Sequence, residues 1–259
     1  IISLHHILDE KNLPTDFDYL SFDFFVFQVV ENYGKWDSIF DIFRDTLHFQ
    51  RPKKFLSYNN IPHPHRTRLK EFLMTEDYMD DGWFSFEPLS ENGLNIDMIS
   101  EFTNNQFTQI NLGLYLTSYF SILTETIFSG DDSPTVKLTN KVFMTMKAFH
   151  PFFMMGQPKT LEYLSQSGFK TFDKWWSESY DNEFNHDKRI TMIFLELEKL
   201  LSVSGENIHR KMFGDSIEEE EWIKLFNILK HNYLHLPVHA ENQKQKVIDK
   251  INDFMGETK

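Results

Sequence analysis

The sequence predicts an α/β fold in which helices cover both faces of a parallel β-sheet. Short apolar runs alternate with helical patterns between residues 53 and 201, as expected of successive strand–helix units. One run, residues 151–155, is apolar throughout and stops at Gly156, which is typical of a strand buried on both faces. Hydrophobic residues make up 41% of the 259 residues, and 27 residues are phenylalanine, so the chain can build a substantial core.

The predicted elements follow one another closely. Strands are expected at residues 55–58, 82–86, 119–124 and 151–155, and helices at residues 66–74, 138–149, 160–167, 187–201, 216–231 and 241–254. Pro158 precedes the third of these helices and Gly168 ends it. Ser216 and Glu219 form a capping-box pattern at the start of the fifth helix. We expect Pro237 to separate the last two helices.

The chain divides into three segments by pattern. Residues 1–50 mix aromatic and acidic residues without a clear period, and we expect a mostly helical or irregular segment there. Residues 51–205 hold the strand–helix alternation and are predicted to form a Rossmann-like domain. Residues 206–259 read as helices that pack on it. The sequence therefore predicts one α/β unit with helical additions at both ends.

Charge and composition narrow the range of partners. The formal net charge is −13, which repels polyanions at long range and makes duplex DNA an unfavourable partner. The absence of cysteine excludes disulfides and thiol chemistry and fits a reducing compartment. No apolar run approaches the roughly 20 residues that a spanning helix needs, and no signal peptide is visible. We expect a cytoplasmic protein without a membrane span.

Polar residues follow the first predicted strand and lead into the next helix. The segment is Asn59-Asn60-Ile61-Pro62-His63-Pro64-His65-Arg66-Thr67-Arg68, and its candidate binding residues are Asn59, His65, Arg66 and Arg68. Arginine presents a planar fork of donors that suits phosphate, and a helix N-terminus adds partial positive charge. Because ligands of parallel sheets bind beyond the carboxyl ends of the strands, this segment is a candidate ligand site. A rigid proline turn with solvated arginines is the alternative interpretation.

Two further charged residues stand at comparable positions. Glu125 follows the strand 119–124, where a carboxylate could take a proton or accept hydrogen bonds from sugar hydroxyls, or simply cap the next element. Lys141 lies in the first turn of a predicted helix, where a cation opposes the helix dipole unless an anion binds beside it. An exposed lysine of small energetic cost is the alternative. We expect Arg66, Glu125 and Lys141 to converge on one cleft.

Two patterns could suggest a metal ion. Three histidines spaced four apart lie between His231 and His239, but Pro237 is expected to interrupt any helix that they share. Asp16-Phe17-Asp18 has the Asp-x-Asp form that metal-dependent glycosyltransferases use, but it does not follow a convincing strand. We therefore predict no metal site.

The order of motifs in the middle of the chain is similar to that of a known family. The motifs are Tyr58-Asn59-Asn60 with His65-Arg66, then residues 120–126, Leu138-Thr139-Asn140-Lys141, His150-Pro151-Phe152, Gly156, Gly168-Phe169-Lys170-Thr171-Phe172 and Glu178-Ser179-Tyr180-Asp181. This order, over residues 55–201, resembles uncharacterised phage and bacterial proteins that look like glycosyltransferases. It also resembles the donor-binding half of the α-1,3-fucosyltransferases, which has a GT-B-type fold.

The resemblance implies a nucleotide-sugar site. In the family, a glutamate and a lysine hold the ribose and the phosphates of the donor, and these positions correspond to Asn140 and Lys141. Lys141 matches the family residue. Asn140 departs from it, since an amide can bind a ribose hydroxyl but supplies no charge. Ser177 stands where related proteins usually have aspartate. The chain is also short for a complete two-domain enzyme.

The resemblance thus predicts a metal-independent glycosyltransferase that moves a sugar from a nucleotide-diphosphate sugar to an acceptor such as a glycan or a modified nucleotide. Glu125 is the candidate base, and no cofactor besides the donor is expected. The predicted donor-binding residues are Asn59, His65, Arg66, Arg68, Asn140, Lys141 and Gly156. The alternatives are a non-catalytic module that kept the fold and binds a nucleotide, a glycan or a protein, and a different α/β enzyme whose aromatic segments only form core.

Overall fold

A four-stranded, all-parallel sheet forms the centre of the molecule. The computed structural model describes residues 2–3, 20–21, 23–33, 38–59, 61–86, 111–129 and 136–257. The strand order is β4-β3-β5-β6. The strands are β3 (Lys53–Ser57), β4 (Gly82–Phe84), β5 (Ser118–Thr124) and β6 (Phe152–Met155). A second, two-stranded parallel pair joins β1 (Ile2–Ser3) to β2 (Leu20–Ser21). The predicted α/β class with a parallel sheet is confirmed.

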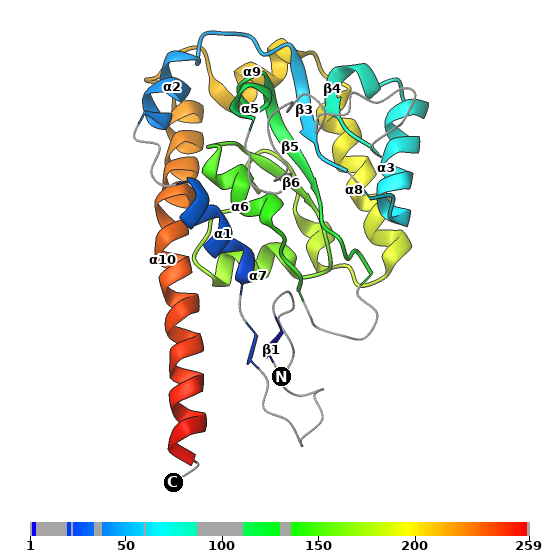
Figure 1. Cartoon of the computed structure of the whole chain (residues 1–259). Coiled ribbons are helices and arrows are strands. Elements are labelled where there is room, and N and C mark those ends of the chain that lie inside the picture. The colour runs from blue at the N-terminus through cyan, green and yellow to red at the C-terminus, as the bar shows by residue number, and fades with distance from the viewer. Residues whose placement is uncertain are drawn as a thin grey trace.

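Helices lie on both sides of this sheet (Figure 1). They are α1 (Phe24–Tyr33), α2 (Ile39–Asp45), α3 (Pro64–Thr75), α5 (Leu112–Leu116), α6 (Asn140–Lys147), α7 (Thr160–Gln166), α8 (His186–Leu201), α9 (Gly205–Phe213) and α10 (Glu220–Glu257). Short 3₁₀ helices span Met79–Asp81 and Ser179–Asn182. Helices α3 and α8 pack together on one side, and α1, α6 and α10 pack together on the other.

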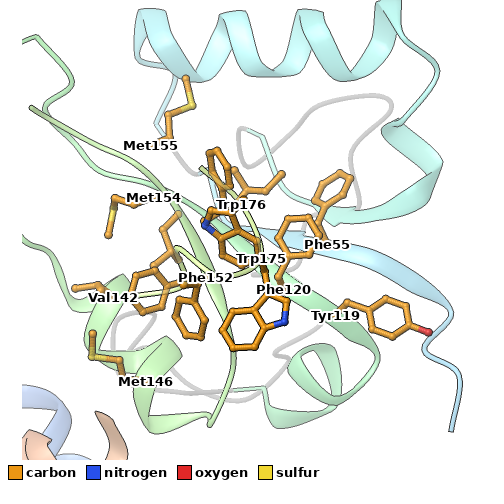
Figure 2. Packing of buried hydrophobic residues seen from close by; sticks show 14 of the residues in the cluster. Phe55, Tyr119, Phe120, Val142, Met146, Phe152, Met154, Met155, Trp175 and Trp176 are labelled. Atoms are coloured by element: carbon orange, nitrogen blue, oxygen red, sulfur yellow. The ribbon is translucent and has the colours of Figure 1, made fainter. Parts of the chain in front are cut away.

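The two strands β5 and β6 are completely buried, which explains the continuous apolar sequence of β6. Every residue of β5 and β6 is buried, because helices cover both faces of the sheet. The aromatic segment after α7 belongs to this core. Phe172 and Trp175 are 0% and 5% exposed. Trp176 packs against Phe120 with ring centroids 5.7 Å apart (Figure 2). The buried cluster also includes Val26 from the N-terminal segment and Trp222 from the C-terminal one.

The C-terminal region differs from the prediction. One helix, α10, replaces the two predicted helices, and it continues through Pro237. A proline inside a helix costs about 3 kcal/mol, because it removes a hydrogen bond and crowds the preceding turn. Burial of apolar residues on both sides of it, including Leu229, Leu236 and Ala240, offsets this cost. The helix begins at Glu220 rather than at the predicted capping box, and α9 was not predicted at all.

Because α10 is continuous, its three histidines lie on one face of the helix. Their rings follow one another along α10, with centroids 5.7 and 6.2 Å apart. The ring nitrogens of His231 and His235 donate to the carbonyls of Gly168 and Ser167 at the end of α7. His239 instead bonds the carboxylate of Asp23 at 2.7 Å. These histidines hold neighbouring elements in place, and within the described ranges no group of three or more side chains could hold a metal ion.

Two further predictions from the sequence concern the Asp-x-Asp pattern and membrane-spanning helices. The Asp16-Phe17-Asp18 pattern lies outside the described residues. Among the helices that the structure describes, none is long and apolar enough to cross a membrane.

Candidate functional site

The strand order creates a crevice at the carboxyl edge of the sheet. From β3 the chain passes through α3 to β4 on one side, and from β5 it passes through α6 to β6 on the other. The direction of winding therefore reverses between the neighbouring strands β3 and β5. In doubly wound sheets, ligands bind in the crevice outside such a switch point. Helices α3 and α6 both begin at this edge, so the side chains of their first turns can meet there.

Two basic residues meet at the end of β5. The Arg66 guanidinium from α3 and the Lys141 ammonium from α6 both donate to the carbonyl oxygen of Thr124, at 3.1 and 3.0 Å. Lys141 also donates to the carbonyl of Tyr58 at 2.7 Å, which joins the end of β3 to the start of α6. Arg66 and Lys141 therefore meet at the residue that precedes Glu125, as predicted, but none of the three is among the residues that line the pocket described below.

Asn59 is part of the framework beneath these cations. Its side chain is completely buried. The carbonyl oxygen of its amide accepts a hydrogen bond from the Thr124 hydroxyl at 2.5 Å, and its amide nitrogen donates to the Ser57 hydroxyl at 2.9 Å. Its backbone N–H donates to the Ser85 hydroxyl. Asn59 thus ties the ends of three strands together, and its polar atoms serve the protein itself.

Glu125 is sealed inside the same framework. Its side chain is 0% exposed, and one carboxyl oxygen accepts the N–H of Thr139 at 3.2 Å, which fixes the start of α6. Its Oε2 has no hydrogen-bond partner within the described residues. Burial raises the pKa of Glu125, although the hydrogen bond from Thr139 and the nearby charge of Lys141 act in the opposite direction. A base must reach the proton that it removes, and this carboxyl does not contact solvent.

The other predicted binding residues take different positions. Asn140 is half-buried at the first position of α6, next to Lys141. Gly156 follows β6, where an added Cβ would lie 3.1 Å from the Thr160 hydroxyl. Arg68 is partly exposed and pairs with Asp187 at 2.9 Å. Residues two positions apart on a helix point in different directions, so Arg68 turns away from Arg66. Arg68 is therefore not among the side chains that meet at Thr124.

A pocket of about 260 Å³ opens beside this cluster. Its wall combines the start of α3, the loop after β5 and the first residue of α8. The lining residues are His63, Pro64, His65, Thr126, Ile127, Phe128, Ser129 and His186. Of these, only His65 was named as a binding residue from the sequence. The His-Pro-His segment at a helix start was the one local signal that could have added His63.

The two histidines at the start of α3 are stacked and uncharged at neutral pH. Burial lowers the pKa of His65 to about 3, and a ring nitrogen of His65 donates to the Glu125 carbonyl at 2.8 Å. Burial also lowers the pKa of His63, and the positive charges of Arg66, Lys141 and Lys137 lower it further. The two rings are nearly parallel, with centroids 5.8 Å apart. Positively charged side chains therefore surround the pocket, although the net charge of the whole chain is −13.

The arrangement suits an anion with a polar body. The cations Arg66 and Lys141 lie close to the pocket, and the N-terminus of α3, a helix of 12 residues, adjoins it. His63, the N-cap residue of α3, makes no side-chain capping bond. Two buried nitrogens, Nε2 of His63 and Nε of Arg66, have no hydrogen-bond partner in the part of the chain that the structure describes. Buried polar atoms without partners are uncommon in folded proteins.

Comparisons with known proteins do not assign the chain to a family. No protein-family model matches the chain, and no curated protein or solved structure matches it. The similarity to glycosyltransferase donor domains therefore remains a prediction from the motifs. The chemistry of the site has to be inferred from its own residues.

Proposed function

We propose that the crevice binds a nucleotide-diphosphate sugar, and that the chain transfers the sugar to an acceptor such as a glycan or a modified nucleotide. The observation that carries the proposal is the meeting of Arg66 and Lys141 at the Thr124 carbonyl, beside the pocket. These cations come from the first turns of two helices on opposite sides of a topological switch point. That is where a phosphorylated ligand of a doubly wound sheet is expected.

The same cations suit the chemistry of transfer. When the bond between the sugar and the diphosphate breaks, negative charge develops on the leaving phosphate. Fixed positive groups in a site that excludes water stabilise such charge strongly and need no rearrangement. In this proposal, Arg66 and Lys141 take the place that a divalent cation occupies in metal-dependent transferases. Asn140, beside Lys141, would bind a ribose hydroxyl.

The size of the pocket limits what it can hold. Drug-sized ligands occupy pockets of about 300–1,000 Å³, so a pocket of about 260 Å³ holds only part of a nucleotide sugar. The proposal assigns to it the sugar and the adjoining phosphate, with the nucleoside extending along the edge of the sheet toward Asn140.

The direct test combines binding with turnover. Melting temperature is measured with uridine, guanosine, adenosine and cytidine diphosphates, since a ligand at 100 times its Kd stabilises by about 2.7 kcal/mol. Release of free nucleotide diphosphate from the matching nucleotide sugars then shows transfer, or slow hydrolysis when water serves as acceptor. A chain that binds none of the four diphosphates contradicts the proposal.

A second candidate is a non-catalytic module that kept the nucleotide site. The complete burial of Glu125 favours it, because the carboxylate that the motifs suggested as base does not reach the crevice. The turnover assay separates the two candidates. A chain that binds a diphosphate tightly but releases none from any nucleotide sugar is the binding module.

A further inference from the structure

We propose that His186 is the catalytic base of the transfer, and that a nitrogen of its ring accepts the proton of the acceptor hydroxyl. This inference rests on the proposed function and gives His186 the role that the motifs suggested for Glu125. Three observations support it: His186 lines the pocket, both of its ring nitrogens contact solvent without a hydrogen-bond partner in the described chain, and the other two histidines of the pocket are less suited to the role.

His186 can present its ring nitrogens to a ligand. It is the first residue of α8, and it lies in the pocket wall together with Thr126 and Ser129. Its side chain is partly buried, and neither ring nitrogen makes a hydrogen bond within the described residues. Neither nitrogen is among the buried polar atoms that lack a partner, so both contact solvent. His186 therefore differs from Glu125, whose unpaired carboxyl oxygen is buried, because a base must reach the proton that it removes.

Packing holds the His186 ring in place without using its nitrogens. The ring lies edge-on to the buried ring of Phe128, with centroids 4.9 Å apart. Arg189, three residues further along α8 and on the same side of the helix, lies over that ring at 4.2 Å. The start of α8 is fixed as well, because the Asn185 side chain caps it by accepting the N–H of Lys188 at 3.0 Å. The first turn of α8 thus positions His186 before any substrate binds.

The other two histidines of the pocket are weaker candidates. Because a carbonyl oxygen only accepts, the hydrogen bond between His65 and the Glu125 carbonyl places a proton on Nε2 of His65. Burial also lowers the pKa of His65 to about 3, so its other nitrogen is a weak base. Nε2 of His63 is buried, and burial together with nearby cations lowers the pKa of His63. A base of lowered pKa takes a proton less readily, which leaves His186 as the best placed of the three.

The base and the leaving group are served by different elements. Helix α8 packs with α3 on one side of the sheet, whereas Lys141 belongs to α6 on the other side (Figure 1). Lys141 and Arg66 meet at the Thr124 carbonyl, close to the pocket but not in its wall. In a single displacement, the acceptor approaches the anomeric carbon on the side away from the departing phosphate. In this proposal the sugar lies between His186 and the two cations.

The step balances without a further reactant. The acceptor oxygen forms a bond to the anomeric carbon of the sugar as the bond from that carbon to the diphosphate oxygen breaks. The electron pair of the broken bond leaves with the nucleotide diphosphate, toward Arg66 and Lys141. The acceptor proton passes to the free ring nitrogen of His186 and returns to solvent after the product leaves.

The test compares His186→Ala with His48→Ala in the full chain, with water as the acceptor. His48 is an exposed histidine between α2 and β3, and alanine is well tolerated at the start of a helix. We expect His186→Ala to lower kcat for nucleotide diphosphate release by about 10²- to 10⁴-fold, the usual contribution of a general base. Calorimetry should show diphosphate affinity within about threefold of the unchanged chain, while His48→Ala retains full turnover.

Chemical rescue gives a readout that a merely structural role would not change. Removal of the ring leaves space beside the pocket, so added imidazole should restore the turnover of His186→Ala at least tenfold. Pyrazole, a ring of the same size that is a much weaker base, should not restore it.

Turnover of His186→Ala within threefold of the unchanged chain would overturn the assignment of the base and leave the proposed function intact. Equal rescue by imidazole and pyrazole, rescue by neither ring, or a loss of turnover that equals the loss of affinity would overturn the assignment as well. An unchanged chain that binds a diphosphate but releases none from any nucleotide sugar would overturn both the transfer and its base.

Discussion

The two ends of strand β5 carry the same pair of residue types. At the amino end, the Arg51 guanidinium donates to the Ser118 carbonyl at 2.5 Å, and a ring nitrogen of His150 donates to the same carbonyl at 2.8 Å. At the carboxyl end, Arg66 and His65 donate to the carbonyls of Thr124 and Glu125. Each end of the strand is thus held by a buried arginine and a neutral histidine.

The surroundings of the two arginines differ. Aromatic rings enclose Arg51, with Phe213 at 4.4 Å and Phe43 at 5.4 Å from its central carbon, and burial lowers its pKa to about 9. Arg66 instead lies close to a second cation, Lys141, at the point where helices α3 and α6 begin and near a pocket. A buried arginine that satisfies strand carbonyls is therefore not evidence for a ligand by itself. Its neighbours decide whether it only stabilises the fold or can also bind.

The largest effect is expected from removing the two arginines. Arg51→Ala should lower the free energy of unfolding by about 3–5 kcal/mol, because the carbonyls of Tyr115 and Ser118 each lose a donor and a cavity opens among the rings. Arg66→Ala should cost less stability, about 1–3 kcal/mol, but should also weaken diphosphate binding at least tenfold. Urea denaturation and calorimetry measure the two quantities. Equal losses of affinity in both variants would contradict the distinction between the two ends.

Acid should destabilise both ends of β5 in the same way. Burial lowers the pKa of His150 and of His65 to about 3, whereas each would titrate near 6.5 in the unfolded chain. Between these values the unfolded state binds more protons, so stability falls as the pH falls from about 6.5 toward 3. Each histidine should contribute about 1.4 kcal/mol per pH unit in that window. His150→Gln and His65→Gln should each flatten the dependence in urea titrations, and an unchanged slope in either variant would contradict its neutral state.

Lys141 should affect the ligand more than the fold. Lys141→Ala removes a charge beside the proposed diphosphate, so affinity should weaken by about 1–3 kcal/mol, the range for a charge-assisted hydrogen bond. Melting temperature should also fall, since two carbonyls lose a donor. Lys174→Ala removes an equal charge from an exposed site and serves as the control. Identical calorimetric affinities for the two variants would reject the placement of the diphosphate at the carboxyl edge.

The smallest effect is expected at Asn140. Asn140→Glu restores the residue that the resembled family carries and adds an ionised acceptor for a ribose hydroxyl. Its charge also approaches the donor phosphates, which opposes the gain, although Lys141 and the N-terminus of α6 offset part of that repulsion. Affinity for the nucleotide diphosphate should therefore rise by less than tenfold in calorimetry. Complete loss of binding would show that the site differs from the family and would favour the non-catalytic module.

Much of the fold could be predicted from the residues alone. Strand β6 reads as a continuous apolar run because both faces of the sheet are buried around it. Gly168 was correctly predicted to end α7, and its φ of 91° and the approach of His235 explain why a side chain would not fit there. The convergence of Arg66 and Lys141 followed from placing each at a helix start after a parallel strand.

Only the tertiary structure decided which polar atoms face each other. The sequence marked Asn59 and Glu125 as available for a ligand, but the strand order β4-β3-β5-β6 turns both inward, where they bond Thr124 and Thr139. It did not show that His186, 123 positions away in the chain, lines the same pocket as His63. It also predicted a break at Pro237, which packing of residues on both sides overrides. Periodicity and capping act between residues a few positions apart, so they determine helices and strands. Hydrogen-bond partners and pockets depend on segments that meet only when the sheet is assembled.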